Sequence, residues 1–346
     1  MNMKKIMFFI IIFCLVVGVW FFYSEIYTAE AQKVEKVSFQ IKNGEDVSAM
    51  TKRLADEQVV RNAWLFRRYL IWKGIDRKIQ QGDYEVDAPI TIARVANTLL
   101  LPGVGERTIT IIPGWDLRDI AEYFEQEGIA SSTEFYDVVG LPAYNYKAAG
   151  QYAPQPFDDV LVLQDKSDYF GLEGYLSPDT FRVFKDASIT DIVSKLVQHR
   201  DSQFTEEMYA DIEASGRSVY EVITVASLLE REVRGEKNKK VVSDLFWRRY
   251  DLNWALQADS TVHYAVGKKG NVFTTKEDRD SLSPWNTYKY PGLPLGPISN
   301  PSFESIMAAM YPTPNDYWYF LTTPEGEVKY AKTLEEHNVN VNRYLR

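Results

Sequence analysis

The chain has 346 residues, 45% of them hydrophobic and 25% charged, which is typical of a folded protein long enough for about two domains. Its net charge of −9 argues against a nucleic-acid partner, because proteins of that class usually carry a basic surface. The three histidines are scattered and the single cysteine lies in the apolar N-terminal run. We therefore expect no metal site, no internal disulfide and no cofactor, and no nucleotide-binding motif is present.

The N-terminus predicts a membrane anchor. Residues 6–23 form an uncharged apolar run, just long enough to cross a bilayer as a helix. Two lysines in front of it and two glutamates behind it favour a cytoplasmic position for residues 1–5, with residues 24–36 as a juxtamembrane linker. The alternative is a cleaved signal peptide, because Ala29-Glu30-Ala31 resembles a cleavage site. We expect a single-pass protein of the inner (cytoplasmic) membrane, with the rest of the chain on the extracytoplasmic side.

A strand, a glycine turn, an aspartate cap and an amphipathic helix occur twice, because Ser38–Val60 aligns with Thr108–Ile129. The first copy continues with a second helix near 63–73 and a returning strand near 82–86. This βααβ order resembles LysM modules, small units that bind glycans containing N-acetylglucosamine. A common βα unit without that function is the alternative. The expected module spans residues 37–104.

The second half of the chain is mainly helical in pattern. Residues 140–172 are rich in Gly, Pro, Asp and Tyr and predict a long surface loop. Apolar spacing predicts a helix over 189–214, another from Ser218 to about Arg234 and a third over about 239–250. The second of these helices begins with the capping-box pattern S-x-x-E.

The stretch ASLLEREV, residues 226–233, places two glutamates near the end of this second helix. At 100° per residue, Glu232 lies about 65° from the centre of the helix's apolar stripe, and Glu230 lies about 95° away, towards two arginines. The stripe consists of Val222, Val225, Ala226, Leu229 and Val233. A carboxyl half-buried beside aliphatic side chains has a raised pKa, which suits a general acid. Glu232 is therefore the better candidate, and the alternative is that both glutamates are solvated surface residues.

Six segments in order carry a resemblance to a known family. They read LEGYLSPDTF, TVASLLEREV, WALQADSTVHYAVG, PWNTYKYPGLPLGPISNPS, YWYFLT and HNVNVNRYL. Together with the N-terminal anchor, they closely resemble the endolytic murein transglycosylase (YceG-like) family over nearly the whole chain from about residue 37. Two positions depart from the family pattern, because Ala258 replaces a hydroxyl residue and Ser177 replaces an aromatic one. These changes weaken any substrate role at those positions.

The resemblance implies an α+β fold, in which an N-terminal transmembrane helix and a LysM-like βααβ module precede a mixed α/β catalytic domain over 105–346. It implies that Glu232 is the catalytic residue of a lytic transglycosylase, cutting glycan strands internally between N-acetylmuramic acid and N-acetylglucosamine. One glutamate would act as general acid and then as base, leaving 1,6-anhydro ends without metal or cofactor. Expected substrate contacts are Gln257, Asp259, Thr261, Asn286, Thr287, Tyr288, Glu173 and Tyr175.

Two other functions stay open from the residues. The protein could be a non-catalytic glycan-binding scaffold of the cell-wall synthesis machinery, which would not depend on Glu232. It could also be a muramidase-like hydrolase, which would pair Glu232 with a second carboxylate such as Asp259. The expected partners are peptidoglycan glycan strands and the membrane, and the resemblance adds peptidoglycan synthases as further candidates.

Overall fold

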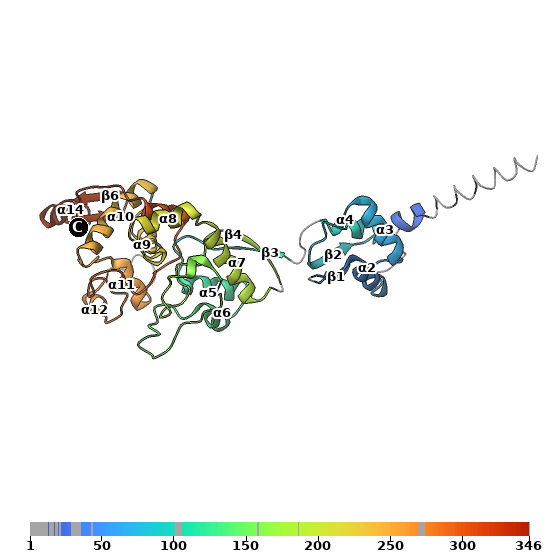
Figure 1. Cartoon of the computed structure of the whole chain (residues 1–346), viewed down its shortest axis with the longest axis horizontal. Coiled ribbons are helices and arrows are strands. Elements are labelled where there is room, and N and C mark those ends of the chain that lie inside the picture. The colour runs from blue at the N-terminus through green and yellow to red at the C-terminus, as the bar shows by residue number, and fades with distance from the viewer. Residues whose placement is uncertain are drawn as a thin grey trace, which may run out of the picture. The chain divides into compact units, whose positions relative to one another are not determined.

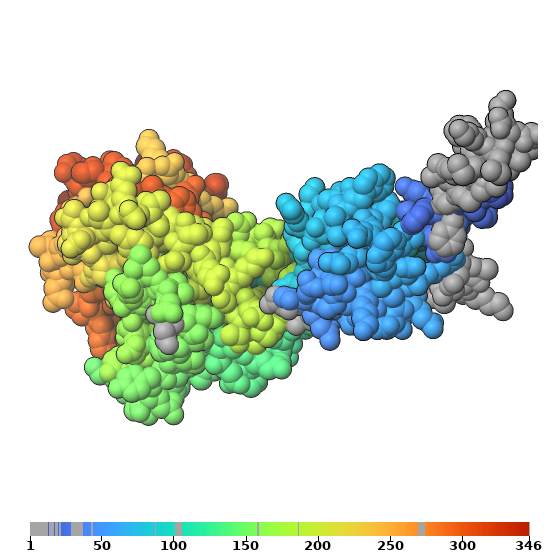
Figure 2. All heavy atoms as spheres, turned by 45° about the vertical axis from the view of Figure 1, so that its right-hand side comes forward, coloured from blue at the N-terminus to red at the C-terminus, as the bar shows by residue number. Residues whose placement is uncertain are grey.

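A computed structural model describes residues 13, 17, 20, 22–28, 36–42, 44–100, 106–157, 159–185, 187–268 and 274–345. The described residues form two compact units, one within 1–108 and 182–186, the other within 109–181 and 187–346. The return of 182–186 to the first unit was not expected from the sequence. Each unit is described by itself. Figure 1 traces the chain with its element labels, and Figure 2 shows residues 36–100 as blue to cyan spheres.

The first unit is a small α+β structure. Its elements are β1 (Lys36–Ile41), α2 (Val47–Asp56), α3 (Ala63–Lys73), β2 (Gly82–Asp87) and α4 (Ile92–Thr98). The βααβ order expected from the sequence is confirmed in its first four elements, and β1 pairs antiparallel with β2. Alternate strand residues point into a core shared with the helices, where the ring of Phe39 stacks on that of Tyr84 at 5.7 Å.

The internal repeat is also confirmed. Asp46 caps α2, accepting hydrogen bonds from the backbone amides of Ser48 and Ala49, and Asp116 caps α5 (Leu117–Gln126) in the same way. The preceding glycine of each copy has a positive φ, +70° and +85°. The two strands differ in their partners, because β1 pairs with β2 whereas β3 (Glu106–Thr110) pairs with β4 (Thr180–Phe184).

The second unit is mostly helical and carries the longer helices. Its remaining elements are α6 (Ser132–Val139), η1 (Leu161–Leu163), α7 (Ile189–Ser202), α8 (Glu206–Ala214), α9 (Val219–Glu232), α10 (Glu236–Asp251), α11 (Asp259–Val266), α12 (Lys276–Arg279), α13 (Phe303–Met310), β5 (Tyr319–Thr322), β6 (Val328–Ala331) and α14 (Leu334–Tyr344). The strands β5 and β6 form an antiparallel hairpin. The three sheets among the described residues each have two strands, so the structure is a mixture of helices and small sheets.

The single helix expected over 189–214 is wrong. The chain leaves the helical path between α7 and α8, and Thr205 starts α8 by accepting a hydrogen bond from the amide of Met208. Threonine favours the N-cap position because its hydroxyl satisfies an unpaired amide of the first turn. The capping box of Ser218 and Glu221 at the start of α9 is confirmed.

Helix α9 is the centre of the second unit. It packs against α8, α10, α11 and α13, and every residue from Val222 to Leu229 is buried. The expected single apolar stripe therefore understates its burial, since Thr224 and Ser227 are also enclosed. The hydroxyl of Ser227 accepts a hydrogen bond from the amide of Ile298 at 3.1 Å, which satisfies a buried polar group.

The predicted transmembrane run over 6–23 lies almost entirely outside the described residues. Within the part of the chain that the structure describes, no helix combines the length and the apolar character needed to cross a bilayer.

Candidate active site

Glu232 is the last residue of α9, and its side chain is half-buried. The helix stops here because Val233 adopts an extended backbone and Gly235 follows with φ of +81°. The hydroxyl of Ser260 donates to Oε1 of Glu232 at 2.6 Å, and the amide of Ser260 donates to the same oxygen at 3.3 Å. Because both donors use Oε1, Oε2 is the oxygen available to carry a proton.

The pKa of Glu232 is raised above the ordinary glutamate value of 4.5. Burial is the largest cause, because the charged form loses hydration. The two hydrogen bonds from Ser260 oppose the shift, and the neighbouring charge of Asp259 adds to it. A carboxyl with a raised pKa can stay protonated closer to neutral pH, as a general acid requires.

Ser260 was not among the residues expected from the sequence. Ala258 occupies the N-cap position of α11 and has no side chain that can cap the helix. The carboxyl of Glu232 accepts a hydrogen bond from the amide of Ser260 in the first turn of α11. Glu232 therefore caps α11 in place of the side chain that Ala258 does not have. The sequence feature that could have indicated Ser260 is the replacement of a hydroxyl residue by Ala258, because it leaves the start of the helix without a side-chain cap.

Glu232 opens onto a cavity of about 620 Å³. Its walls come from the end of α9, from α10, α11 and α14, and from strand β5. The lining residues are Glu232, Phe246, Arg249, Leu256, Gln257, Ala258, Asp259, His263, Tyr288, Tyr319, Phe320, Leu321, Thr322, Leu334, His337, Val341 and Leu345. The cavity thus combines the carboxyl of Glu232 with aromatic faces and further polar groups, which suits a polar ligand with apolar ring faces.

A second carboxylate, Asp259, lines the same cavity and is held by two hydroxyl donors. Tyr288 donates to its Oδ1 at 2.9 Å and Thr274 donates to the same atom at 2.6 Å. Burial and the charge of Asp259 raise the pKa of Tyr288, so its hydroxyl stays protonated as a donor. Asp259 therefore keeps a fixed position beside Glu232.

The other predicted contacts fall into two groups. Gln257 lines the cavity with Asp259 and Tyr288, and its φ of +55° is a strained conformation for a residue other than glycine. Thr261 and Thr287 are buried behind this wall, and their hydroxyls lie 2.9 Å apart. The hydroxyl of Thr287 also accepts the amide of Ala258 at 3.1 Å, which holds the residues before α11.

Asn286 also supports the wall from behind. It is fully buried, and its amide donates to the carbonyls of Arg279 and Ser281 at 2.8 and 2.9 Å. Its Oδ1 accepts the amide of Tyr288 at 3.0 Å. The structure therefore gives Asn286 a positioning contact with a residue that lines the cavity.

Glu173 and Tyr175 are both buried and neither lines the cavity. The carboxyl of Glu173 accepts hydrogen bonds from the amide of Leu117 at 3.1 Å and from the hydroxyl of Tyr264 at 3.0 Å. Its other oxygen accepts the side-chain amide of Asn300 at 3.2 Å. Burial raises the pKa of Glu173 well above its usual value. These contacts give it a structural role between distant segments.

Glu230 has a different environment from the one expected. Its Oε2 accepts the amide and hydroxyl of Ser302 and the hydroxyl of Ser305, at 2.9, 2.5 and 2.6 Å. Lys239, with its ammonium group 3.4 Å away, replaces the two arginines expected beside it. Burial raises the pKa of Glu230, but these bonds and the lysine charge outweigh burial, and the net pKa is lowered. Glu230 therefore ties α9 to the start of α13 as a carboxylate.

Arg249 is another cavity residue that the sequence analysis missed. Its side chain is 5% exposed, and its guanidinium donates to the carbonyls of Leu256 and Trp318. Burial lowers its pKa to about 10. No local motif marks this arginine, because its partners come from the segment between α10 and α11 and from the segment before β5.

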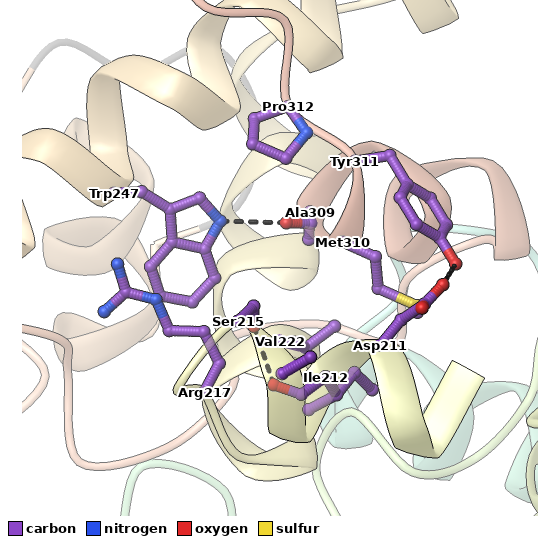
Figure 3. A pocket seen from close by; sticks show the side chains of 11 residues that line it. Asp211, Ile212, Ser215, Arg217, Val222, Trp247, Ala309, Met310, Tyr311 and Pro312 are labelled. Carbon is purple, nitrogen blue, oxygen red and sulfur yellow. Dashed lines mark hydrogen bonds between the residues drawn. The ribbon is translucent and has the colours of Figure 1, made fainter. Parts of the chain in front are cut away.

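A separate pocket of about 450 Å³ lies between α8, α10 and α13 (Figure 3). Its wall includes Trp247, whose indole donates to the carbonyl of Ala309 at 2.8 Å. The carboxylate there, Asp211, accepts the hydroxyl of Tyr311 at 2.6 Å. Most of its lining is apolar, and its carboxylate is exposed and already accepts the hydroxyl of Tyr311. The cavity at Glu232 is therefore the stronger candidate for acid–base chemistry.

Comparisons with known proteins identify the family of this chain. Residues 39–343 match the model of the YceG-like family. The chain is 30% identical to a Bacillus subtilis (strain 168) protein named endolytic murein transglycosylase, covering 96% of this chain and 91% of that one. It is 26% identical to a Streptococcus pneumoniae (strain D39) protein of the same name, covering 91% of this chain but only 60% of that longer protein.

A solved structure of a yceG-like protein is also similar to this chain. A crystal structure of a yceG-like protein from Listeria monocytogenes aligns with a TM-score of 0.56 and 28% identity, covering 90% of this chain and all of that one. The chain belongs to the YceG-like family.

The two glutamates should respond oppositely to loss of charge. Glu230→Gln should lower the free energy of unfolding by about 1–3 kcal/mol, because three partly buried donors lose a carboxylate acceptor. Glu232→Gln should leave stability at pH 7 unchanged or higher, because it removes a charge that burial disfavours and keeps an oxygen for Ser260. Urea unfolding of both variants measures this. A larger loss in Glu232→Gln than in Glu230→Gln would contradict the assignment.

Proposed function

We propose that the protein is a membrane-anchored endolytic lytic transglycosylase that cuts peptidoglycan glycan strands between N-acetylmuramic acid and N-acetylglucosamine. The observation that carries this proposal is the half-buried carboxyl of Glu232, with its raised pKa, at the edge of a large cavity. Family membership supports an enzyme acting on murein, because two relatives carry that activity in their names.

In the proposed reaction, protonated Glu232 donates its proton from Oε2 to the glycosidic oxygen. The C1–O bond of the muramyl residue breaks, and the ring gains oxocarbenium character. The new carboxylate then takes the proton of the muramyl C6 hydroxyl, and O6 bonds to C1. This step forms the 1,6-anhydro end and returns the proton to Glu232. The reaction requires neither a water molecule nor a second catalytic carboxylate.

Asp259 supplies negative charge on the same side of the cavity. Its carboxylate, oriented by Tyr288 and Thr274, favours positive charge developing on the muramyl ring. The same charge raises the pKa of Glu232 and so helps to keep the acid protonated. Gln257 is placed to donate to sugar hydroxyls from the same wall.

A muramidase-like hydrolase is the second candidate, and one observation favours it. Asp259 lines the cavity that contains Glu232, so two carboxyls are present, as hydrolysis normally requires. The two reactions leave different products, because hydrolysis gives reducing muramyl ends and transglycosylation gives anhydro ends.

The membrane anchor is part of the proposal. The apolar run over 6–23 would hold the protein in the cytoplasmic membrane, with both units on the extracytoplasmic side. This position would bring the site to newly made glycan strands and to the synthases that make them. The full chain should incorporate into phospholipid nanodiscs, and its recovery as free protein would contradict the anchor.

Digestion of purified, uncrosslinked glycan strands tests the reaction. The wild-type protein should release fragments with 1,6-anhydro-muramyl ends, as seen by mass spectrometry. Glu232→Gln should lower the rate by at least about 10²-fold, the smaller end of a general acid's contribution. Glu236→Gln, an exposed glutamate on α10, is the control and should cleave normally. Reducing ends would indicate the hydrolase, and intact strands with wild-type protein would indicate a scaffold.

The pH dependence tests the role of Glu232 as an acid. Because the protonated form is active, kcat should fall as pH rises through the raised pKa of Glu232. Ser260→Ala removes the hydroxyl hydrogen bond that stabilises the carboxylate and keeps the amide bond, so the falling limb should move to higher pH. Asp259→Asn removes a nearby negative charge, so the limb should move to lower pH. Shifts in the same direction for both variants would refute this electrostatic assignment.

A further inference from the structure

Helix α3 in the first unit has a second apolar face that nothing in the described chain covers. Its inner face packs into the core through Leu65, Phe66, Tyr69 and Leu70. On the opposite side, the exposed fractions are 59% for Trp64, 46% for Ile71 and 71% for Trp72. These three residues are spaced by seven and eight positions and therefore share one side of the helix. A helix that is apolar on both sides is usually buried on both.

Basic side chains accompany these aromatic rings. Arg67 and Arg68 are exposed on the same outer face, and Lys73 closes the helix. The guanidinium of Arg68 lies 5.6 Å from the ring of Trp64, and the ammonium of Lys73 lies 4.6 Å from the ring of Trp72. Over residues 63–78 the sequence has five basic residues and one acidic one, a net charge of +4 in a chain of net charge −9. This face is therefore basic, although the protein as a whole is acidic.

The same helix contacts the residues that follow the apolar N-terminal run. Ile26 packs against the core of this unit, and the side chain of Tyr27 lies beside that of Tyr69 of α3. Figure 1 shows the short helix that contains these two residues close to α3. If residues 6–23 cross the membrane, only a few residues separate the bilayer from the contact with α3. This geometry keeps the first unit near the lipid surface.

We propose that the outer face of α3, defined by Trp64, Arg67, Arg68, Ile71 and Trp72, docks on the membrane surface and binds anionic phospholipid headgroups. Tryptophan rings prefer the interface between headgroups and acyl chains, and arginine pairs with lipid phosphates. Each basic residue near an anionic surface contributes about a five-fold gain in binding. The inference rests on the proposed membrane anchor and is independent of the proposed cleavage reaction.

Reconstitution of the full chain in nanodiscs tests this surface. Nanodiscs would contain phosphatidylcholine alone or mixed with phosphatidylglycerol, with a fraction of the lipids brominated near the headgroup. Tryptophan fluorescence should be quenched more strongly in the anionic nanodiscs. The excess quenching should be lost in a Trp64→Ala, Trp72→Ala double variant. Retention of that excess in the double variant would overturn the proposal.

Charge variants give a matched comparison. Arg68→Gln should lower the ratio of docked to undocked protein about five-fold in anionic nanodiscs. Lys52→Gln, an exposed basic residue on α2 of the same unit, should change it less than two-fold. Equal effects of the two variants, or equal quenching in neutral and anionic nanodiscs, would overturn the proposal.

Two other occupants would give different results. A fluorescence change on adding soluble glycan strands, without excess quenching by anionic lipid, would show a glycan-binding face and overturn the proposal. Quenching that depends on protein density in the nanodiscs would show contact with a second copy and would also overturn it. Loss of cleavage with normal docking would contradict the proposed reaction alone, so the two failures are distinguishable.

Discussion

The structure of the second unit depends on the burial of α9. A helix enclosed on all sides from Val222 to Leu229 cannot rotate or slide without exposing apolar surface or breaking the contacts of Ser227. Its final turn therefore has a defined orientation. Glu230 secures that turn to the start of α13, and Glu232, two residues later, points instead towards the cavity.

The two glutamates show how one helix turn can produce opposite acid strengths. Both are partly buried, so desolvation raises the pKa of each. Glu230 receives three donors and a lysine, which outweigh desolvation and keep it ionised. Glu232 receives only the two donors of Ser260 and faces the charge of Asp259, so desolvation prevails. The number of donors and the sign of the neighbouring charge together decide which carboxyl is a structural anion and which is an acid.

Much of the local structure could be predicted, because its causes are local. The aspartate caps of the repeat, the capping box of α9 and the βααβ order follow from residues within a few positions of each other. The helical wheel could distinguish the position of Glu232 from that of Glu230 because it depends only on residues of the same helix. It could not show that Glu230 is anchored, because Ser302 lies 72 residues away in the sequence. The burial of Glu173 likewise depends on Leu117, Tyr264 and Asn300.

The central claim is that Glu232 keeps its proton above the ordinary glutamate pKa of 4.5. Infrared difference spectra of wild-type and Glu232→Gln protein over a pH series would isolate the carboxyl band of this one residue. The account predicts that the protonated band persists above pH 4.5 and disappears at a distinctly higher pH. Ionisation of Glu232 at or below pH 4.5 would contradict it.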